Sequence, residues 1–189
     1  GPLVHADEFF NHQVVETHAS VLQSDLNWTE KVCGMVAKRD GSLSIGFGFG
    51  KYVNRNVVDA YGGVSQGVQQ WTVRASRALD TEPNNIDVGP LTYEVIQPLQ
   101  QIKVCLLANE HQPIAFELLL EGLLPCVTED REDRRTLTGY RHSANQIRYH
   151  QIGVASGWIE VAGTRHEVTP HEWVMTRDHS WGLRPGVGL

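Results

Sequence analysis

The sequence predicts an all-β protein, either an antiparallel barrel or a strongly curved sandwich. Three observations lead to this prediction: many short runs rich in β-branched and aromatic residues, turn residues between these runs, and almost no apolar pattern with a helical period. The composition of the 189 residues does not change along the chain in a way that would mark a second core. We therefore expect a single β domain over residues 1–189.

The individual elements follow from the extended runs and the turns between them. Asp40-Gly41 is typical of a tight hairpin turn, and Ala162-Gly163 predicts a second hairpin, which Pro170 separates from the last run. The charged stretch 128–135 is either a solvated loop or a short helix. The polar connection 127–148 either covers a pocket mouth or is a surface excursion without a role. The predicted strands cover residues 31–38, 42–52, 68–75, 91–107, 114–124, 149–161, 164–168 and 172–181.

The run Gly46-Phe47-Gly48-Phe49-Gly50 alternates glycines with aromatic residues. It lacks the Gly-Lys-Ser/Thr ending of a phosphate-binding loop, so we do not expect a nucleotide there. In a strand the glycines share one face and leave a stripe without side chains. The stripe predicts a close approach of another part of the protein or, second, of a ligand.

Composition and short motifs argue against several classes of protein. A net charge of −6 disfavours a nucleic-acid partner, and no apolar run reaches the roughly 20 residues of a transmembrane helix. Three widely spaced cysteines predict reduced thiols and hence a cytoplasmic location. The nine histidines show neither H-x-H nor H-E-x-x-H spacing, and no serine lies in a G-x-S-x-G motif. No metal, no cofactor and no nucleophilic hydrolase is therefore predicted.

The segment 173–181 concentrates two indoles, a guanidinium, a carboxyl group and an imidazole in one predicted strand. Alternation places Arg177, His179 and Trp181 on one face and Asp178 on the other. If the first face lines a cavity, His179 can transfer protons near neutral pH. If the second does, burial would raise the pKa of Asp178 and make it the acid. In the structural alternative Asp178 pairs with Arg177 or caps a turn, and Trp181 plugs the barrel end.

Asp178-His179-Ser180-Trp181-Gly182 resembles the D-H-x-W-G signature of the hydroxyneurosporene synthase (carotenoid 1,2-hydratase) and AttH-like family. The stretch from Tyr149 to Gly163 is similar to the preceding hairpin of that family. Asp7-Glu8 with His12, followed by Trp28-Thr29-Glu30, is similar to the beginning of family members. The resemblance implies lipocalin-like (calycin-type) β domains, two in succession. Because the chain ends at Leu189, soon after this signature, we expect it to be the N-terminal of the two.

The resemblance also implies cofactor-free chemistry on apolar, unsaturated molecules, with Asp178 and His179 as catalytic candidates. Our first hypothesis is therefore an acid–base enzyme of the hydratase, isomerase or cyclase type, with a hydrophobic small molecule in a barrel pocket. The alternative is a non-catalytic small-molecule binding protein, or the structural half of a two-domain protein. A second lipocalin-like domain or a second copy of the chain is the expected protein partner. The residues expected to contact the ligand are Trp181, Trp158, Trp71, Arg177, Tyr61 and His150.

Overall fold

The computed structural model of the protein describes residues 3–10, 12, 24–79 and 84–185. Within this part, twelve strands form one antiparallel sheet with the main order β4-β3-β2-β1-β12-β10-β7-β6-β5, and β8, β9 and β11 pair with β10. The elements are η1 His5–Glu8, β1 Trp28–Lys38, β2 Ser44–Tyr52, η2 Val53–Arg55, β3 Val57–Gln66, β4 Gln69–Ala78, β5 Leu91–Gln97, β6 Gln101–Leu106, β7 Ile114–Gly122, β8 Val127–Thr128, β9 Glu132–Arg135, β10 His142–Val161, β11 Thr164–Val168 and β12 Trp173–Leu183. None of the helices in the described part has the length and apolar composition needed to span a bilayer.

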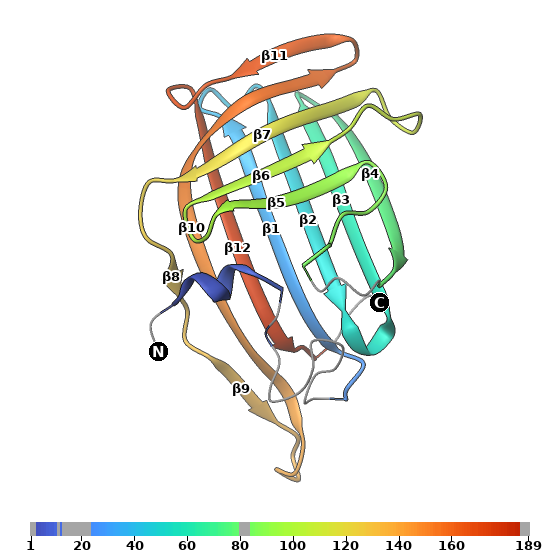
Figure 1. The fold of residues 1–189 in the computed structure, drawn as a ribbon, viewed down its shortest axis with the longest axis vertical. Coiled ribbons are helices and arrows are strands. Elements are labelled where there is room, and N and C mark those ends of the chain that lie inside the picture. Colours follow the sequence, from blue (N-terminus) through green and yellow to red (C-terminus); the bar gives the residue numbers. More distant parts are fainter. Residues whose placement is uncertain (1–2, 11, 13–23, 80–83, 186–189) are drawn as a thin grey trace.

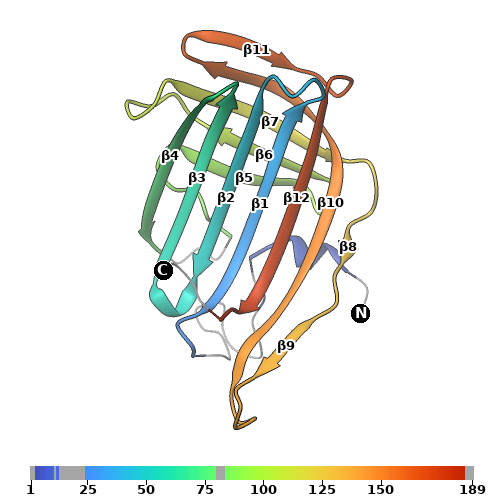
Figure 2. The same cartoon turned by 180° about the vertical axis from the view of Figure 1, so that it is seen from behind.

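The sheet curls into a half-barrel. β1 to β4 and β12 run side by side, and β5, β6 and β7 cross them at a steep angle on one side (Figures 1 and 2). The space between these two groups of strands holds the apolar core, which includes Phe47, Phe116 and Trp173. The predicted antiparallel, strongly curved all-β fold is thereby confirmed.

Strand β10 joins the two parts of the sheet. Its residues Asn145 to Val154 pair with β12, and its residues Gly153 to Val161 pair with β7. Gly153 lies where the partner changes, and a β-carbon there would come within 1.9 Å of the carbonyl oxygen of Glu121. Glycine therefore permits the close backbone approach that lets one strand serve both parts of the curled sheet.

Strand β2 shows how alternation divides the inside from the outside. Phe47 and Phe49 are buried in the core, so the glycines that alternate with them, Gly46, Gly48 and Gly50, face the outer, convex side of the sheet. A β-carbon on Gly48 would lie 2.4 Å from the ring of Tyr61, which packs over it from the neighbouring strand β3. The predicted stripe therefore exists, and the protein's own side chains approach it closely.

The structure corrects four details of the predicted elements. Residues 57–66 form a strand, β3, that the sequence pattern did not indicate. Residues 91–107 contain two strands that pair as a hairpin around Leu99, which has a positive φ of 61°. The stretch 128–135 contains extended segments instead of a helix, because β8 and β9 pair with the edge of β10. The connection 127–148 is therefore largely part of the sheet.

Candidate functional site

Strand β12 carries the residues that the sequence analysis selected, and its pairing with β1 and β10 runs without a register shift. Consecutive side chains therefore point to opposite faces. Arg177 and His179 are 3% and 0% exposed inside the half-barrel. Asp178 lies on the convex face. The wall of Arg177, His179 and Trp181 is thus the inner one, and no bulge brings Asp178 to the same side.

Glu8 and Arg177 form a buried ion pair at the inner wall. Figure 1 shows helix η1, in blue, lying over β10 and β12 on the concave side, and this placement brings Glu8 inside. Arg177 Nη1 and Nη2 donate to Glu8 Oε1 and Oε2 at 2.7 and 2.9 Å. Glu8 is fully buried. Two parallel hydrogen bonds compensate both charges for the loss of water.

Tyr149 connects this ion pair to His179. Its hydroxyl lies 2.8 Å from Glu8 Oε1, to which it donates, and 2.9 Å from His179 Nδ1. On the other side of the imidazole, His179 Nε2 lies 2.8 Å from Glu30 Oε1. Since Tyr149 has one proton and donates it to Glu8, every hydrogen bond in this chain is made only when both ring nitrogens of His179 carry a hydrogen. The geometry therefore suits a protonated imidazole held between an oxygen acceptor on each side.

Glu30 joins His179 to His12, the third basic group of the cluster. His12 Nδ1 lies 2.5 Å from Glu30 Oε1, and His12 Nε2 lies 3.1 Å from Asp7 Oδ1. Burial acts to raise the pKa of Glu30, but its hydrogen bonds to His12 and His179 and their positive charges lower it to about 2. Burial acts against the charged form of His12, yet Glu30 and Asp7 together raise its pKa above the usual 6.5. We define Asp7, Glu8, His12, Glu30, Tyr149, Arg177 and His179 as the inner cluster.

Trp181 separates the inner cluster from a hollow at the end of the half-barrel. Its ring stacks on His12 with centroids 3.4 Å apart and an angle of 16° between the planes. Trp181 also lines a hollow of about 320 Å³ together with Trp28 and Ile147. Polar groups of Arg131 and the 145–146 segment complete its lining. The hollow thus offers aromatic and apolar surface next to a chain of hydrogen-bonded titratable groups.

His12, Glu30 and His179 are the residues in the described part that can hold a metal ion, with one donor atom of each within 4.8 Å of the others. Their N···O separations of 2.5 and 2.8 Å are hydrogen-bond lengths. Ligand atoms around a zinc ion, at roughly 2.0–2.1 Å from it, lie farther apart than this. The present arrangement therefore suits shared protons better than a metal.

Asp178 belongs to a different environment on the convex face. Its Oδ1 accepts a hydrogen bond from Cys33 Sγ at 2.7 Å, and its Oδ2 lies 3.4 Å from Arg148 Nε. Asp178 lines a groove of about 680 Å³ on this face, and Tyr61 lines the same groove. His150 stands opposite Asp178 in the pairing of β10 with β12 and contacts Glu129. Asp178, the expected acid, and Tyr61, an expected ligand contact, thus line one groove on the other side of the sheet from His179.

The remaining predicted ligand contacts lie apart from both places. Trp71 packs against the core from β4. Trp158 lies in the hairpin of β10 and β11, where the guanidinium of Arg165 stands 4.6 Å from its ring centre. Neither tryptophan lines the groove or the hollow described above.

Sequence reasoning did not select Glu8, His12, Glu30 or Tyr149 as site residues. A signal for them existed, because the two N-terminal stretches similar to the hydratase and AttH-like family contain the first three, and Tyr149 opens the hairpin that resembles it. The stretches are short and distant from β12, with 149 positions between Glu30 and His179. The pairing of β1 with β12 brings Glu30 to His179, the pairing of β10 with β12 brings Tyr149, and the placement of helix η1 brings Glu8.

The fold is similar to three solved structures, each over about half of their length. A Nitrosomonas europaea protein assigned as an AttH gives a TM-score of 0.61 at 12% identity, covering 83% of this chain and 51% of that one. Kievitone hydratase from Nectria haematococca gives 0.57 at 9% identity, covering 92% and 53%. CghA gives 0.54 at 14% identity, covering 96% and 55%. These likenesses establish the lipocalin-like fold that the sequence resemblance implies.

A comparison with curated protein sequences finds no match. A family model does match, and it covers nearly the whole chain, residues 3–188. The protein therefore belongs to the family of unknown function DUF8625.

Proposed function

We propose that the protein is a cofactor-free acid–base enzyme of the hydratase, isomerase or cyclase type, acting on an apolar, unsaturated small molecule. One observation carries the proposal: His179 is fully buried between the hydroxyl of Tyr149 and the carboxylate of Glu30. Trp181, two residues further along β12, lies on the same face of the strand. A buried imidazole with a partner on each nitrogen is arranged to hold and pass a proton.

The proton leaves the cluster at His12 in this proposal. His12 stacks on Trp181, its side chain is 12% exposed, and its pKa is raised by Glu30 and Asp7 against the effect of burial. A raised pKa favours the charged imidazole, which is the form that a general acid needs. Glu30 contacts both imidazoles and therefore allows His179 to restore the proton that His12 gives away.

His12 does not itself line the hollow, so in this proposal the double bond of the substrate reaches past the Trp181 ring to His12 and is protonated there. The proton forms a bond to one alkene carbon, and the electron pair of the double bond leaves the other carbon positive. Water then adds and returns a proton to the imidazole in a hydration, whereas loss of a different proton to the imidazole completes an isomerisation. In a cyclisation, attack by a second double bond closes the ring and moves the positive charge to another carbon, and loss of a neighbouring proton to the imidazole gives the neutral product. The face of the Trp181 ring stabilises the transient positive charge.

Tyr149, Glu8 and Arg177 are positioning residues in this scheme. The ion pair of Glu8 with Arg177 fixes the carboxylate to which Tyr149 donates, and Tyr149 in turn fixes the ring of His179. Such a partner on the second nitrogen selects the orientation and the protonation of an imidazole.

The comparisons support the class of reaction and the need for a partner. One of the similar structures is named a hydratase, and this chain spans about half of its length. We propose that a second lipocalin-like domain, or a second copy of this chain, completes the wall of the hollow around Trp28 and Trp181. The name of a protein with 9% identity suggests the reaction type and leaves the substrate open.

Proton transfer to carbon gives the test. The protein is incubated in D₂O with a panel of linear polyenes and dienes, and mass spectrometry follows the appearance of deuterium in carbon-bound positions. We expect incorporation by the wild-type protein and a loss of about 100-fold in His179→Gln, since general acid–base groups contribute roughly 10²–10⁴-fold.

The matched control is Asp178→Asn, which alters the neighbouring position on the opposite face and is expected to retain incorporation. Undiminished incorporation in His179→Gln would refute the proposed relay. Tight binding of a polyene without any incorporation would instead identify the protein as the non-catalytic binding protein of the alternative hypothesis.

A further inference from the structure

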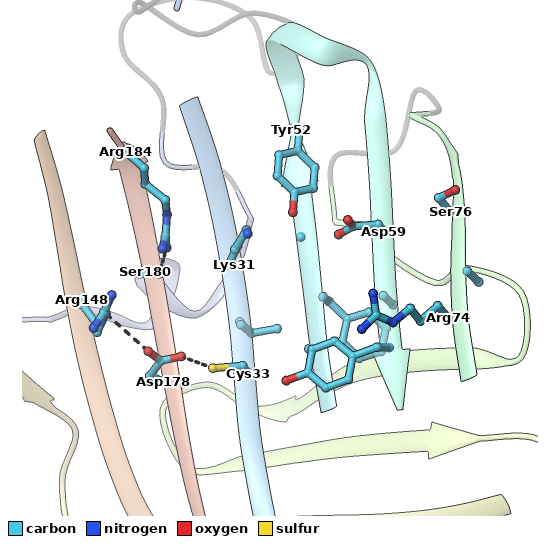
Figure 3. A pocket seen from close by; sticks show the side chains of 17 residues that line it. Lys31, Cys33, Tyr52, Asp59, Arg74, Ser76, Arg148, Asp178, Ser180 and Arg184 are labelled. Carbon is cyan, nitrogen blue, oxygen red and sulfur yellow. Dashed lines mark hydrogen bonds and ion pairs between the residues drawn. The ribbon is translucent and has the colours of Figure 1, made fainter. Parts of the chain in front are cut away.

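The convex face carries a groove of about 680 Å³ that is separate from the inner cluster (Figure 3). Arg148 and Asp178, on β10 and β12, lie on one side of it, and Arg74 and Ser76, on β4, lie on the other. The sheet itself separates this groove from His179, which points to the opposite face of β12. The groove therefore forms a second place at which a small molecule can bind.

Positive charge exceeds negative charge in the groove, although the chain as a whole carries a net charge of −6. Lys31, Arg74, Arg148 and Arg184 supply four cations, whereas Asp59 and Asp178 are its carboxylates. Asp178 is engaged with Arg148 and with the thiol of Cys33. Among the described residues, no carboxylate lies within 4.0 Å of Lys31, Arg74 or Arg184.

The cations at one end of the groove are held close to one another. Arg184 donates to the hydroxyl of Thr29 at 2.9 Å and to that of Ser180, and these bonds direct its guanidinium toward Arg148 and Lys31. Burial and the charge of Arg184 lower the pKa of Lys31, and burial and the charge of Arg148 lower that of Arg184. An anion bound among these three groups would relieve their mutual repulsion.

The floor and the aromatic side chains of the groove offer a flat surface beside this charged end. Gly48 and Gly50 carry no side chains, so rings from other positions can lie close to the backbone of β2. Tyr61, which is 41% exposed, lies over Gly48, whereas Tyr52, which is 6% exposed, covers Gly50 and has the Lys31 ammonium 5.2 Å from its ring centre. The exposed ring of Tyr61 in the same groove as these cations suits a ligand that is flat at one end and anionic at the other.

We propose that this groove binds an organic anion, with its carboxylate or phosphate between Lys31, Arg148 and Arg184 and its aromatic or unsaturated body against Tyr61. The site is independent of the inner cluster, so it stands whether or not the proposed enzyme activity is found. Its occupant is recognised by charge and by stacking, whereas the hollow beside Trp181 offers mainly apolar contacts.

Calorimetric titration with four probes tests the proposal: 1-naphthoate, 1-naphthyl phosphate, the neutral 1-naphthamide and inorganic phosphate. We expect at least one naphthyl anion to bind at least about tenfold more tightly than the neutral amide and than inorganic phosphate, and binding to weaken as salt is added. The stronger of the two naphthyl anions identifies the acidic group.

Substitutions test whether the naphthyl anion binds in this groove. Arg184→Gln and Lys31→Gln are each expected to weaken the naphthyl anion at least about tenfold, since each removes a charge-assisted contact. Arg165→Gln, which alters an exposed arginine on β11, and His179→Gln, on the inner wall, should leave the affinity unchanged. If Arg184→Gln fails to fold, Lys31→Gln still decides the question, with circular dichroism as the check of folding.

Equal affinity for the amide and the anions would overturn the charge recognition. Affinity for inorganic phosphate as high as for 1-naphthyl phosphate would overturn the contact with Tyr61. A loss in Arg165→Gln as large as in Lys31→Gln would show nonspecific attraction and overturn the site itself.

Discussion

The two faces of strand β12 place charged residues in opposite situations. Inside, Arg177 is 3% exposed and makes two hydrogen bonds of 2.7 and 2.9 Å to a fully buried carboxylate. Outside, the side chain of Asp178 is 19% exposed and lies 3.4 Å from Arg148, with further cations nearby that have no carboxylate of the described part within 4.0 Å. Where water is excluded the protein must match every charge itself, whereas at the surface it can leave charges for a ligand.

The largest expected difference between the faces concerns stability. Arg177→Met leaves Glu8 buried without its partner, and we expect the free energy of unfolding to fall by about 3–5 kcal/mol. Arg148→Gln removes an ion pair near the surface, and we expect a fall of about 1 kcal/mol or less. Urea denaturation measures both values. Equal losses would mean that the inner ion pair is no more important to the fold than the outer one.

The pH dependence of stability should also reside in the inner face. The pKa of Glu30 falls from 4.5 to about 2 on folding, so its contribution is complete above pH 4.5 and is lost as the pH falls from 4.5 toward 2. This loss amounts to about 3 kcal/mol. The pKa of His12 is raised, so its contribution is complete below pH 6.5 and is lost as the pH rises through its folded value.

Thermal unfolding from pH 2 to 8 checks this dependence. The acidic limb should flatten in Glu30→Gln and persist in Asp178→Asn. A wild-type melting temperature that does not change between pH 4.5 and 2 would contradict the assignment of Glu30 as the group responsible.

On the outer face, steric effects at the glycine stripe should be smaller. Gly48→Ala forces the Tyr61 ring to move, because the new β-carbon would lie 2.4 Å from it, and we expect a loss of about 1–3 kcal/mol. Gly46→Ala is the matched control on the same strand and face, since a β-carbon there would lie 3.9 Å from the Tyr61 ring. Urea denaturation compares the two variants. A loss at position 46 as large as at position 48 would show that Tyr61 is not the cause.

The smallest expected effect is on the reactivity of Cys33. Loss of water around its sulfur and the adjacent carboxylate of Asp178 raise the pKa of this thiol to about 12. We expect slow alkylation by iodoacetamide at pH 8 and a rate several-fold higher in Asp178→Asn, since the thiolate is the reactive form. Mass spectrometry follows Cys126 in the same samples as the internal control. An unchanged rate at Cys33 would show that Asp178 does not hold the thiol in its neutral form.

The fold and part of the inner wall could be predicted from local sequence patterns. Alternation along 173–181 places Arg177, His179 and Trp181 together, and the structure confirms that they share one face. The runs and turns indicate most strands, with β3 as an omission. The helix alternative for 128–135 is wrong because pairing with β10 extends that segment, an effect that charge patterning along the sequence does not report.

The residues that contact the inner wall could not be predicted in the same way. Glu8 and Tyr149 lie 141 positions apart, and their contact depends on the placement of helix η1 over the concave face. The groove likewise combines side chains of β1, β2, β3, β4, β10 and β12, which become neighbours only through the strand order of the sheet.

The sequence by itself therefore determined that Asp178 and His179 face opposite sides, because side chains alternate along any regular strand. Only the tertiary structure decided which side is inside. That choice depends on the direction in which the whole sheet curls around Phe47, Phe116 and Trp173, and hence on burial of apolar surface contributed by distant strands. The curl assigns the imidazole to a buried relay and the carboxylate to an open groove.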